Sequence, residues 1–110
     1  MAGKITTHVL DTASGKPGAG IVIELHRFES GAKSFLTRTV TNADGRTDQP
    51  LLSDGALSTG LSELTFAVGD YFQSGFLDTV PVRFRVDDPD AHYHVPLLCS
   101  PWSYSTYRGS

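Results

Sequence analysis

Apolar and polar residues alternate along most of this chain, a period of two that is typical of strands with one buried face. In the first strand Ile5, Thr7 and Val9 point one way, and the apolar pair marks this as the core side. His8 is therefore expected on the outer face. The pattern predicts strands at residues 4–11, 20–28, 34–41, 63–68 and 80–86, followed by a closing hairpin that begins at residue 92 and turns at residues 100–101.

The closing hairpin carries an unusual density of polar and aromatic side chains. In its first strand His92 and His94 share one face, opposite the apolar face. After the turn Ser105 and Tyr107 share a face with each other. Because strands of a hairpin lie side by side, the pattern predicts that His94 comes near the row of Ser105 and Tyr107 on a polar sheet surface.

One short helix is expected at residues 70–74. Asp70 can cap its start, Gln73 occupies the capping-box position, and Gly75 can end it. Turn signals stand at residues 42–45 and 87–90. Seven or eight short strands at intervals of about ten residues, with one brief helix, predict an all-β antiparallel sandwich that forms one domain over residues 1–110.

The chain has 110 residues and a formal net charge of −3, with 9 Lys and Arg against 12 Asp and Glu. Such a weak acidic field argues against nucleic acid or an anionic membrane as partner. No apolar run reaches transmembrane length and no export signal opens the chain, so a cytoplasmic protein is expected. The single cysteine, Cys99, allows no disulfide within the chain.

His8 and His94 are the candidates for proton transfer, because both lie on outer strand faces and imidazole titrates near neutral pH. Arg46 directly follows a turn, where its guanidinium can bind an anion or an oxyanion. Arg108 and the carboxylate of Ser110 admit the same reading. Each of these residues can equally be an ordinary solvated side chain.

Two other chemistries are weaker. His92 and His94 have a spacing that can chelate a metal, but no third ligand is near them in the sequence. Ser103 and Ser105 lie outside a Gly-x-Ser-x-Gly elbow, which argues against a serine nucleophile.

Three stretches of the sequence resemble 5-hydroxyisourate hydrolases of the transthyretin-like family. They are ITTHVLD at residues 5–11, followed by Gly-Lys-Pro at residues 15–17; TNADGR at residues 41–46; and SPWSYSTYRGS at residues 100–110. The terminal Tyr-Arg-Gly-Ser is the most specific of them, and the resemblance covers essentially the whole chain.

The resemblance implies a transthyretin-like sandwich of two four-stranded sheets with one short helix. It also implies a homotetramer, a dimer of dimers with active sites at the interface between dimers. The activity implied is hydrolysis of 5-hydroxyisourate to 2-oxo-4-hydroxy-4-carboxy-5-ureidoimidazoline, without a cofactor. Carried onto this sequence, the catalytic residues are His8, Arg46 and His94, and the residues expected to bind substrate are Ser105, Tyr107, Arg108 and Ser110.

The sequence leaves the roles of the two histidines open. Either can be the general base, and we slightly favour His8 without a derivation from the residues. Two rival functions also stay open at this point. One is a transthyretin-like carrier that binds a small ligand without catalysis, and the other is a metal-binding sandwich that uses His8, His92 and His94 as ligands.

Overall fold

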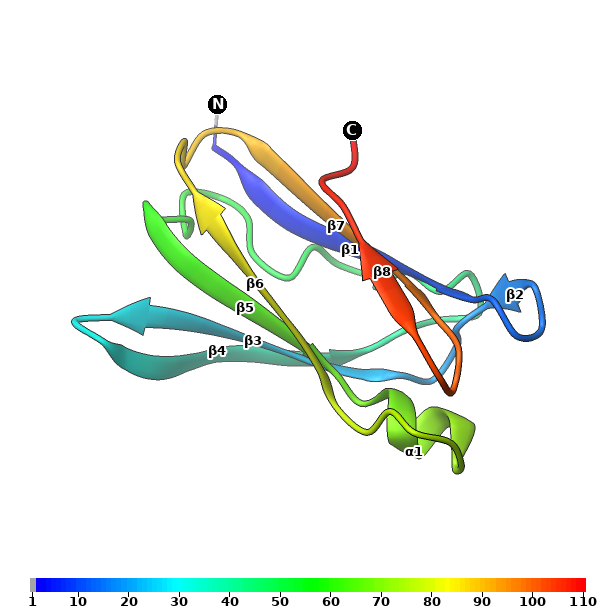
Figure 1. Ribbon diagram of the computed structural model, residues 1–110. Coiled ribbons are helices and arrows are strands. Elements are labelled where there is room, and N and C mark those ends of the chain that lie inside the picture. The colour runs from blue at the N-terminus through cyan, green and yellow to red at the C-terminus, as the bar shows by residue number, and fades with distance from the viewer. Residues whose placement is uncertain (1) are drawn as a thin grey trace.

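Eight strands and one helix lie within residues 2–110, which are the residues that the computed structural model describes (Figure 1). In chain order the elements are β1 (Lys4–Asp11), β2 (Lys16–Pro17), β3 (Val22–Glu29), β4 (Ala32–Val40), β5 (Gly60–Phe66), α1 (Val68–Phe72), β6 (Val80–Val86), β7 (His92–Cys99) and β8 (Tyr104–Thr106). Their bounds agree with the predicted strands to within a few residues, except at β2, where the sequence predicts only a turn.

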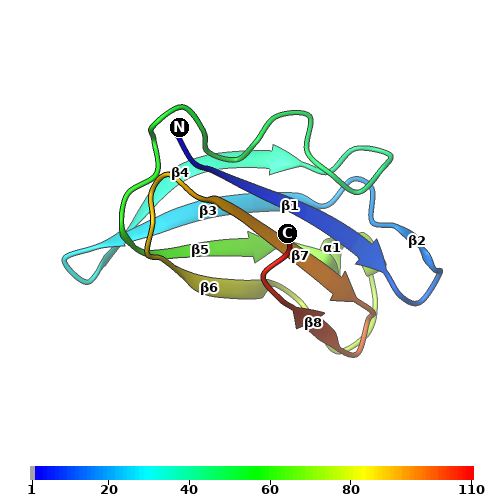
Figure 2. The ribbon, with the colours of Figure 1, turned by 90° about the horizontal axis from the view of Figure 1, so that it is seen from above.

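The strands form two four-stranded sheets, ordered β2-β1-β7-β8 and β4-β3-β5-β6. Figures 1 and 2 show them as two layers, with α1 at one end. This confirms the predicted sandwich with one short helix. One pairing differs from the antiparallel expectation: β1 and β7 run parallel, in register over the whole of both strands. Parallel neighbours need a long connection, and here the entire second sheet supplies it.

The core lies between the two sheets and consists of the apolar residues that the alternation assigns to inner faces. The fully buried members include Ile5, Val9, Ile23, Leu25, Leu64, Phe66 and Leu97. The long segment between β4 and β5 also takes part, because Leu51 and Leu57 are buried and Leu52 bridges to Ile5. The segment that the sequence predicts as a polar loop is therefore fixed against the first sheet.

The helix prediction is wrong in its bounds and in its cap. Helix α1 covers Val68–Phe72, and Ala67 at its N-cap makes no side-chain hydrogen bond. Asp70 lies within the first turn, and Gln73, in the left-handed conformation with φ 61°, ends the helix. Fully buried Val68 fixes the start instead, so packing overrides the capping signal. This helix, the one found in residues 2–110, is too short to cross a membrane.

Candidate active site

The outer face of the first sheet gathers polar side chains from the adjacent strands β1 and β7. The parallel register sets Thr6 opposite His94 and His8 opposite Pro96. The alternation of side chains along both strands decides which residues face outward. The apolar residues point into the sandwich, and Thr6, His8 and the two histidines of β7 lie outside. The predicted outer positions of His8 and His94 are confirmed.

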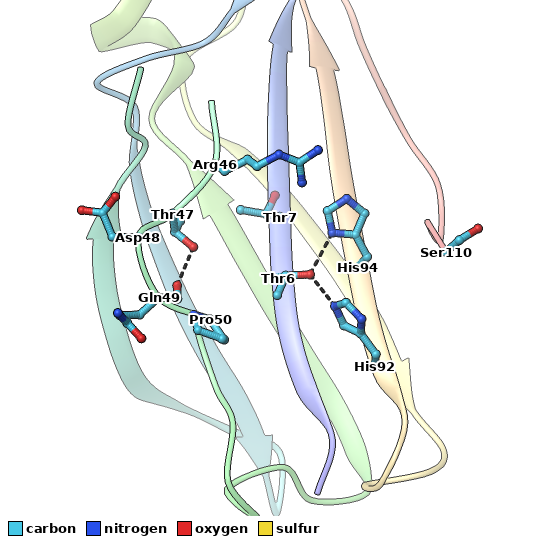
Figure 3. A pocket seen from close by; sticks show the side chains of 10 residues that line it. All are labelled: Thr6, Thr7, Arg46, Thr47, Asp48, Gln49, Pro50, His92, His94 and Ser110. Carbon is cyan, nitrogen blue, oxygen red and sulfur yellow. Dashed lines mark hydrogen bonds between the residues drawn. The ribbon is translucent and has the colours of Figure 1, made fainter. Parts of the chain in front are cut away.

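A pocket of about 390 Å³ opens on this face (Figure 3). Its size is within the range of small-molecule sites. The residues around it are nearly all polar. They are Thr6, Thr7, Arg46, Thr47, Asp48, Gln49, Pro50, His92, His94 and Ser110.

Arg46 reaches the pocket because the turn at residues 42–46 docks on β1. The side-chain Oδ1 of Asn42 accepts hydrogen bonds from the backbone N–H groups of Asp44 (2.9 Å) and Arg46 (3.2 Å), which closes the turn. The N–H of Val9 then donates to the carbonyl of Gly45 at 2.8 Å. Gly45 has φ 74°, and a Cβ on it would meet the Val9 carbonyl at 2.4 Å. A glycine is therefore required where the turn meets β1.

The hydroxyl of Thr6 joins the two histidines of β7. Thr6 Oγ1 is 2.6 Å from Nε2 of His92 and 2.8 Å from Nδ1 of His94. The ring centroids of His92 and His94 lie 6.1 Å apart. Both rings thus direct one nitrogen to the same hydroxyl, as Figure 3 shows.

The end of the chain runs back along β7 and closes one side of the pocket. The N–H of Gly109 donates to the carbonyl of His94 at 2.7 Å, and the two residues form an isolated bridge. A Cβ on Gly109 would lie 2.5 Å from Cδ2 of the His94 ring. The absence of a side chain at this position lets the backbone pass directly beside the imidazole and places Ser110 at the pocket.

Burial and the Arg46 guanidinium both act on the two outer-face histidines that the sequence singles out. Burial lowers the pKa of His94 below its ordinary value, and the Arg46 guanidinium lowers it further, followed by the neighbouring imidazoles. Burial and then Arg46 also lower the pKa of His8, and the smaller opposing effect of Asp44 does not cancel this shift. Both imidazoles are therefore neutral near pH 7 and able to accept a proton, next to a permanent cation.

The structure brings together part of the predicted site. Arg46, His94 and Ser110 line the pocket. His8 lies on the same face and acts electrostatically on His94, but it is not among the lining residues. Ser105 pairs with Leu98, farther along β7 than His94.

Tyr107 and Arg108 do not line the pocket that contains His94. Both line a second pocket of about 320 Å³, between the edges formed by β6 and β8. The Arg108 guanidinium lies 4.4 Å from the centroid of the Tyr93 ring, and its Nη2 donates to the carbonyl of His92 at 3.3 Å. The expectation that the hairpin brings Tyr107 near His94 does not describe this arrangement, because β8 ends at Thr106 and Tyr107 lines the second pocket.

Sequence reasoning missed Thr6 and the wall formed by residues 47–50. Thr6 had a usable signal, since it lies two positions before His8 on the same strand and hence on the same face. Residues 47–50 had no such signal in the sequence, because their position depends on how the long segment between β4 and β5 packs against β1. Among residues 2–110 no group of three or more His, Cys, Asp or Glu side chains is arranged to hold a metal.

A two-sheet sandwich with a histidine- and arginine-lined pocket on one outer face defines a transthyretin-type fold with a polar ligand site. Sea bream transthyretin, solved in complex with thyroxine, has the same fold, with a TM-score of 0.89 at 23% identity over 96% of this chain and 94% of that one. The model of the HIUase/Transthyretin family matches residues 5–109. The chain belongs to this family.

Two relatives of high identity carry the same name. The 5-hydroxyisourate hydrolase of Halalkalibacterium halodurans is 55% identical over the whole of both chains. That of Deinococcus radiodurans is 54% identical over 96% of this chain and 95% of its own.

Two further solved structures match. The 5-hydroxyisourate hydrolase of Klebsiella pneumoniae has a TM-score of 0.83 at 33% identity, over 97% of this chain and 99% of that one. An (S)-allantoin synthase has a TM-score of 0.92 at 48% identity over 99% of this chain. This chain spans 44% of the length of that synthase.

Proposed function

We propose that this protein is an enzyme that hydrolyses 5-hydroxyisourate, as the names of its full-length relatives suggest. The observation that carries the proposal is the pocket in which His94, neutral near pH 7, lies beside the Arg46 guanidinium. A neutral imidazole accepts a proton from attacking water, and a fixed cation stabilises the charge that develops on the attacked carbonyl. The polar lining suits a small, oxygen- and nitrogen-rich ring better than an apolar ligand.

The reaction follows from these groups. Water attacks a ring amide carbonyl while an imidazole takes one of its protons, and Arg46 stabilises the oxyanion of the tetrahedral intermediate. The carbon–nitrogen bond then breaks, and the imidazolium returns its proton to the leaving nitrogen. The ring opens to 2-oxo-4-hydroxy-4-carboxy-5-ureidoimidazoline, and no cofactor takes part in this scheme.

We assign the base to His94 and not to His8, the histidine slightly favoured before the structure was considered. His94 lines the pocket and binds Thr6 through Nδ1, which leaves Nε2 for the substrate side. His8, beside Arg46 on the same face, orients water or contacts the leaving group in this proposal.

The direct test is to generate 5-hydroxyisourate in place from urate with urate oxidase and to follow its ultraviolet decay. Marked acceleration over the spontaneous rate supports the hydrolase. Binding of a small ligand with no acceleration would support the carrier function instead and overturn the proposal.

The charge of Arg46 sets the pH range of activity in this scheme. Because the guanidinium lowers the pKa of His8 and of His94, Arg46→Gln raises both pKa values. A base with a raised pKa is protonated at a higher pH, so the acid limb of the kcat profile is expected to move to higher pH, in addition to a loss of about 10²-fold at the optimum. Proton NMR titration of the two imidazoles measures the shift directly.

The matched control for this change is Arg38→Gln, which removes an exposed arginine from β4 in the other sheet. It is expected to leave both imidazole pKa values and kcat unchanged. If the acid limb of Arg46→Gln coincides with that of the wild type, Arg46 does not tune the base.

We further propose a cytoplasmic homotetramer, a dimer of dimers with its active sites between dimers. Exposed Trp102, Tyr104 and Tyr107 on and beside β8 support further burial of this edge. Tyr107 and Arg108 line the second pocket of their own chain and not the one that His94 lines, and in this proposal they complete the pocket of another chain.

A hybrid experiment tests the shared site. The variants His94→Ala and Arg108→Ala are each expected to be poorly active alone. In mixed oligomers formed by co-expression, some sites combine an intact His94 with an intact Arg108 of another chain. Activity well above that of either variant is therefore expected, whereas a site built within one chain predicts no recovery. Light scattering of the same samples gives the oligomeric state.

A further inference from the structure

The Thr6 hydroxyl is shared by two imidazoles, and its single proton links their protonation states. Oγ1 lies 2.6 Å from Nε2 of His92 and 2.8 Å from Nδ1 of His94, as the dashed lines of Figure 3 show. A hydroxyl has one donor and two acceptor positions. It can donate to one ring only, so at least one of these two nitrogens carries its own proton and donates to Oγ1.

His94 is prepared as a base whenever its Nδ1 donates to Thr6, but only one of these arrangements lets Thr6 pass a proton on to His92. His94 donates from Nδ1 to Thr6, and Thr6 donates to Nε2 of His92. A neutral His94 protonated at Nδ1 has a free lone pair on Nε2. Among residues 2–110, Nε2 of His94 has no hydrogen-bond partner and is not buried, so it remains accessible.

We propose that Thr6 and His92 form a proton relay behind His94, which fixes its tautomer and carries away the proton that it takes from water. This relay rests on the proposed hydrolase function. When Nε2 of His94 accepts a proton from attacking water, the Nδ1 proton passes to Thr6 Oγ1. The hydroxyl proton of Thr6 passes to Nε2 of His92. His94 ends neutral, Thr6 is unchanged, and His92, already protonated on Nδ1, becomes the imidazolium.

The surroundings of the two rings give this transfer its direction. His94 is half-buried and faces the cation Arg46 and the imidazole of His8. His92 is exposed, and the charges that face it are Lys4 of β1 and Arg108 of the C-terminal segment. All these groups oppose a positive charge, but water solvates an exposed imidazolium far better than a half-buried one. When the leaving nitrogen needs a proton, the same line runs in reverse.

The relay has a signature in the resting protein that needs no substrate. Long-range proton–nitrogen NMR distinguishes a protonated Nδ1 from a protonated Nε2 in each histidine ring. The wild type is expected to show His94 protonated at Nδ1, and Thr6→Ser to keep this tautomer. Thr6→Val, which removes the hydroxyl from a strand position and keeps the side-chain shape, is expected to lose it. A wild-type His94 protonated at Nε2, or a tautomer unaffected by Thr6→Val, would overturn the relay.

Kinetics separates a relay from a support that merely holds the ring. Thr6→Val is expected to lower kcat by about 10-fold to 100-fold with little change in KM, and Thr6→Ser to restore it to within a few-fold. His92→Gln can still accept the Thr6 hydrogen bond but cannot take up a proton. A relay predicts that its kcat falls as in Thr6→Val, whereas a structural role predicts nearly full activity.

Thr37→Val on β4 of the other sheet is the matched control, because it makes the same chemical change at a residue that does not line the pocket. It is expected to keep wild-type kcat. A wild type that does not accelerate the reaction would overturn the hydrolase function and the relay together. An active wild type with unchanged kcat in Thr6→Val and His92→Gln would overturn the relay alone.

Discussion

Replacement of His94 by alanine is expected to lower kcat for 5-hydroxyisourate by about 10³-fold while the protein stays folded. The side chain lies on the outer face of β7, where it lines the pocket and takes no part in the core between the sheets. Its loss removes the proposed base and leaves Arg46 to stabilise the oxyanion without a proton acceptor beside it. Steady-state kinetics and thermal unfolding of the same preparation measure the two effects separately.

His26→Ala is the matched control, because it also deletes one imidazole from a strand. His26 lies on β3 in the other sheet, with its ring 5.5 Å from that of Phe35 in an edge-on contact. This variant is expected to lose some stability and keep wild-type kcat. Turnover of His94→Ala within a few-fold of the wild type would remove His94 from the mechanism, whatever the behaviour of His26→Ala.

The part of this structure that could be predicted from the sequence is the part set by alternation within single strands. The buried positions of Ile5 and Val9 on β1, and the outer positions of His8 and His94, follow from a period of two. Alternation is local, and it holds whichever strand lies alongside. This is why the faces were predicted correctly while the parallel pairing of β1 with β7 was not.

Features that depend on distant parts of the chain were beyond sequence reasoning. Glu63 is an example: it is only 6% exposed although alternation marks Leu64 and Phe66 as the inner residues of β5. Two cations from other strands of the sheet form ion pairs with its carboxylate: Lys33 of β4 at 2.9 Å and Arg83 of β6 at 3.3 Å. Long-range contacts of this kind are set by register across the sheet, which the order of residues does not reveal.

The candidate site shows the same division. Arg46 was identifiable because a strong turn signal precedes it, and the turn is indeed closed by Asn42. The direction of the Arg108 side chain could not be predicted. It depends on where the chain leaves β8 and on the Tyr93 ring that the Arg108 guanidinium covers. The resemblance to hydrolases named Arg108 as a substrate ligand without indicating which chain's pocket it serves.

The substitution Gly109→Ala, which adds a single methyl group, is expected to lower kcat as severely as many changes to a catalytic side chain. The added Cβ would lie 2.5 Å from Cδ2 of His94, well inside van der Waals contact. The ring cannot turn away freely, since Nδ1 is held by Thr6 and the Gly109 N–H is held by the His94 carbonyl. A displacement of the base by about 1 Å can cost about 10²-fold in rate, and a loss of that size is expected in kcat for Gly109→Ala.

A double-mutant cycle shows whether this loss acts through His94. If Gly109→Ala works by displacing the imidazole, it has nothing left to displace once His94 is alanine, and the double variant should turn over no more slowly than His94→Ala alone. Independent effects would instead multiply. Crystal structures of Gly109→Ala and the wild type would show the ring shift directly, and thermal unfolding is expected to change little because Gly109 lies on the surface of the first sheet, outside the core. An undisplaced ring with a lost kcat would place the role of Gly109 in the backbone of the C-terminal segment rather than in the room it leaves for His94.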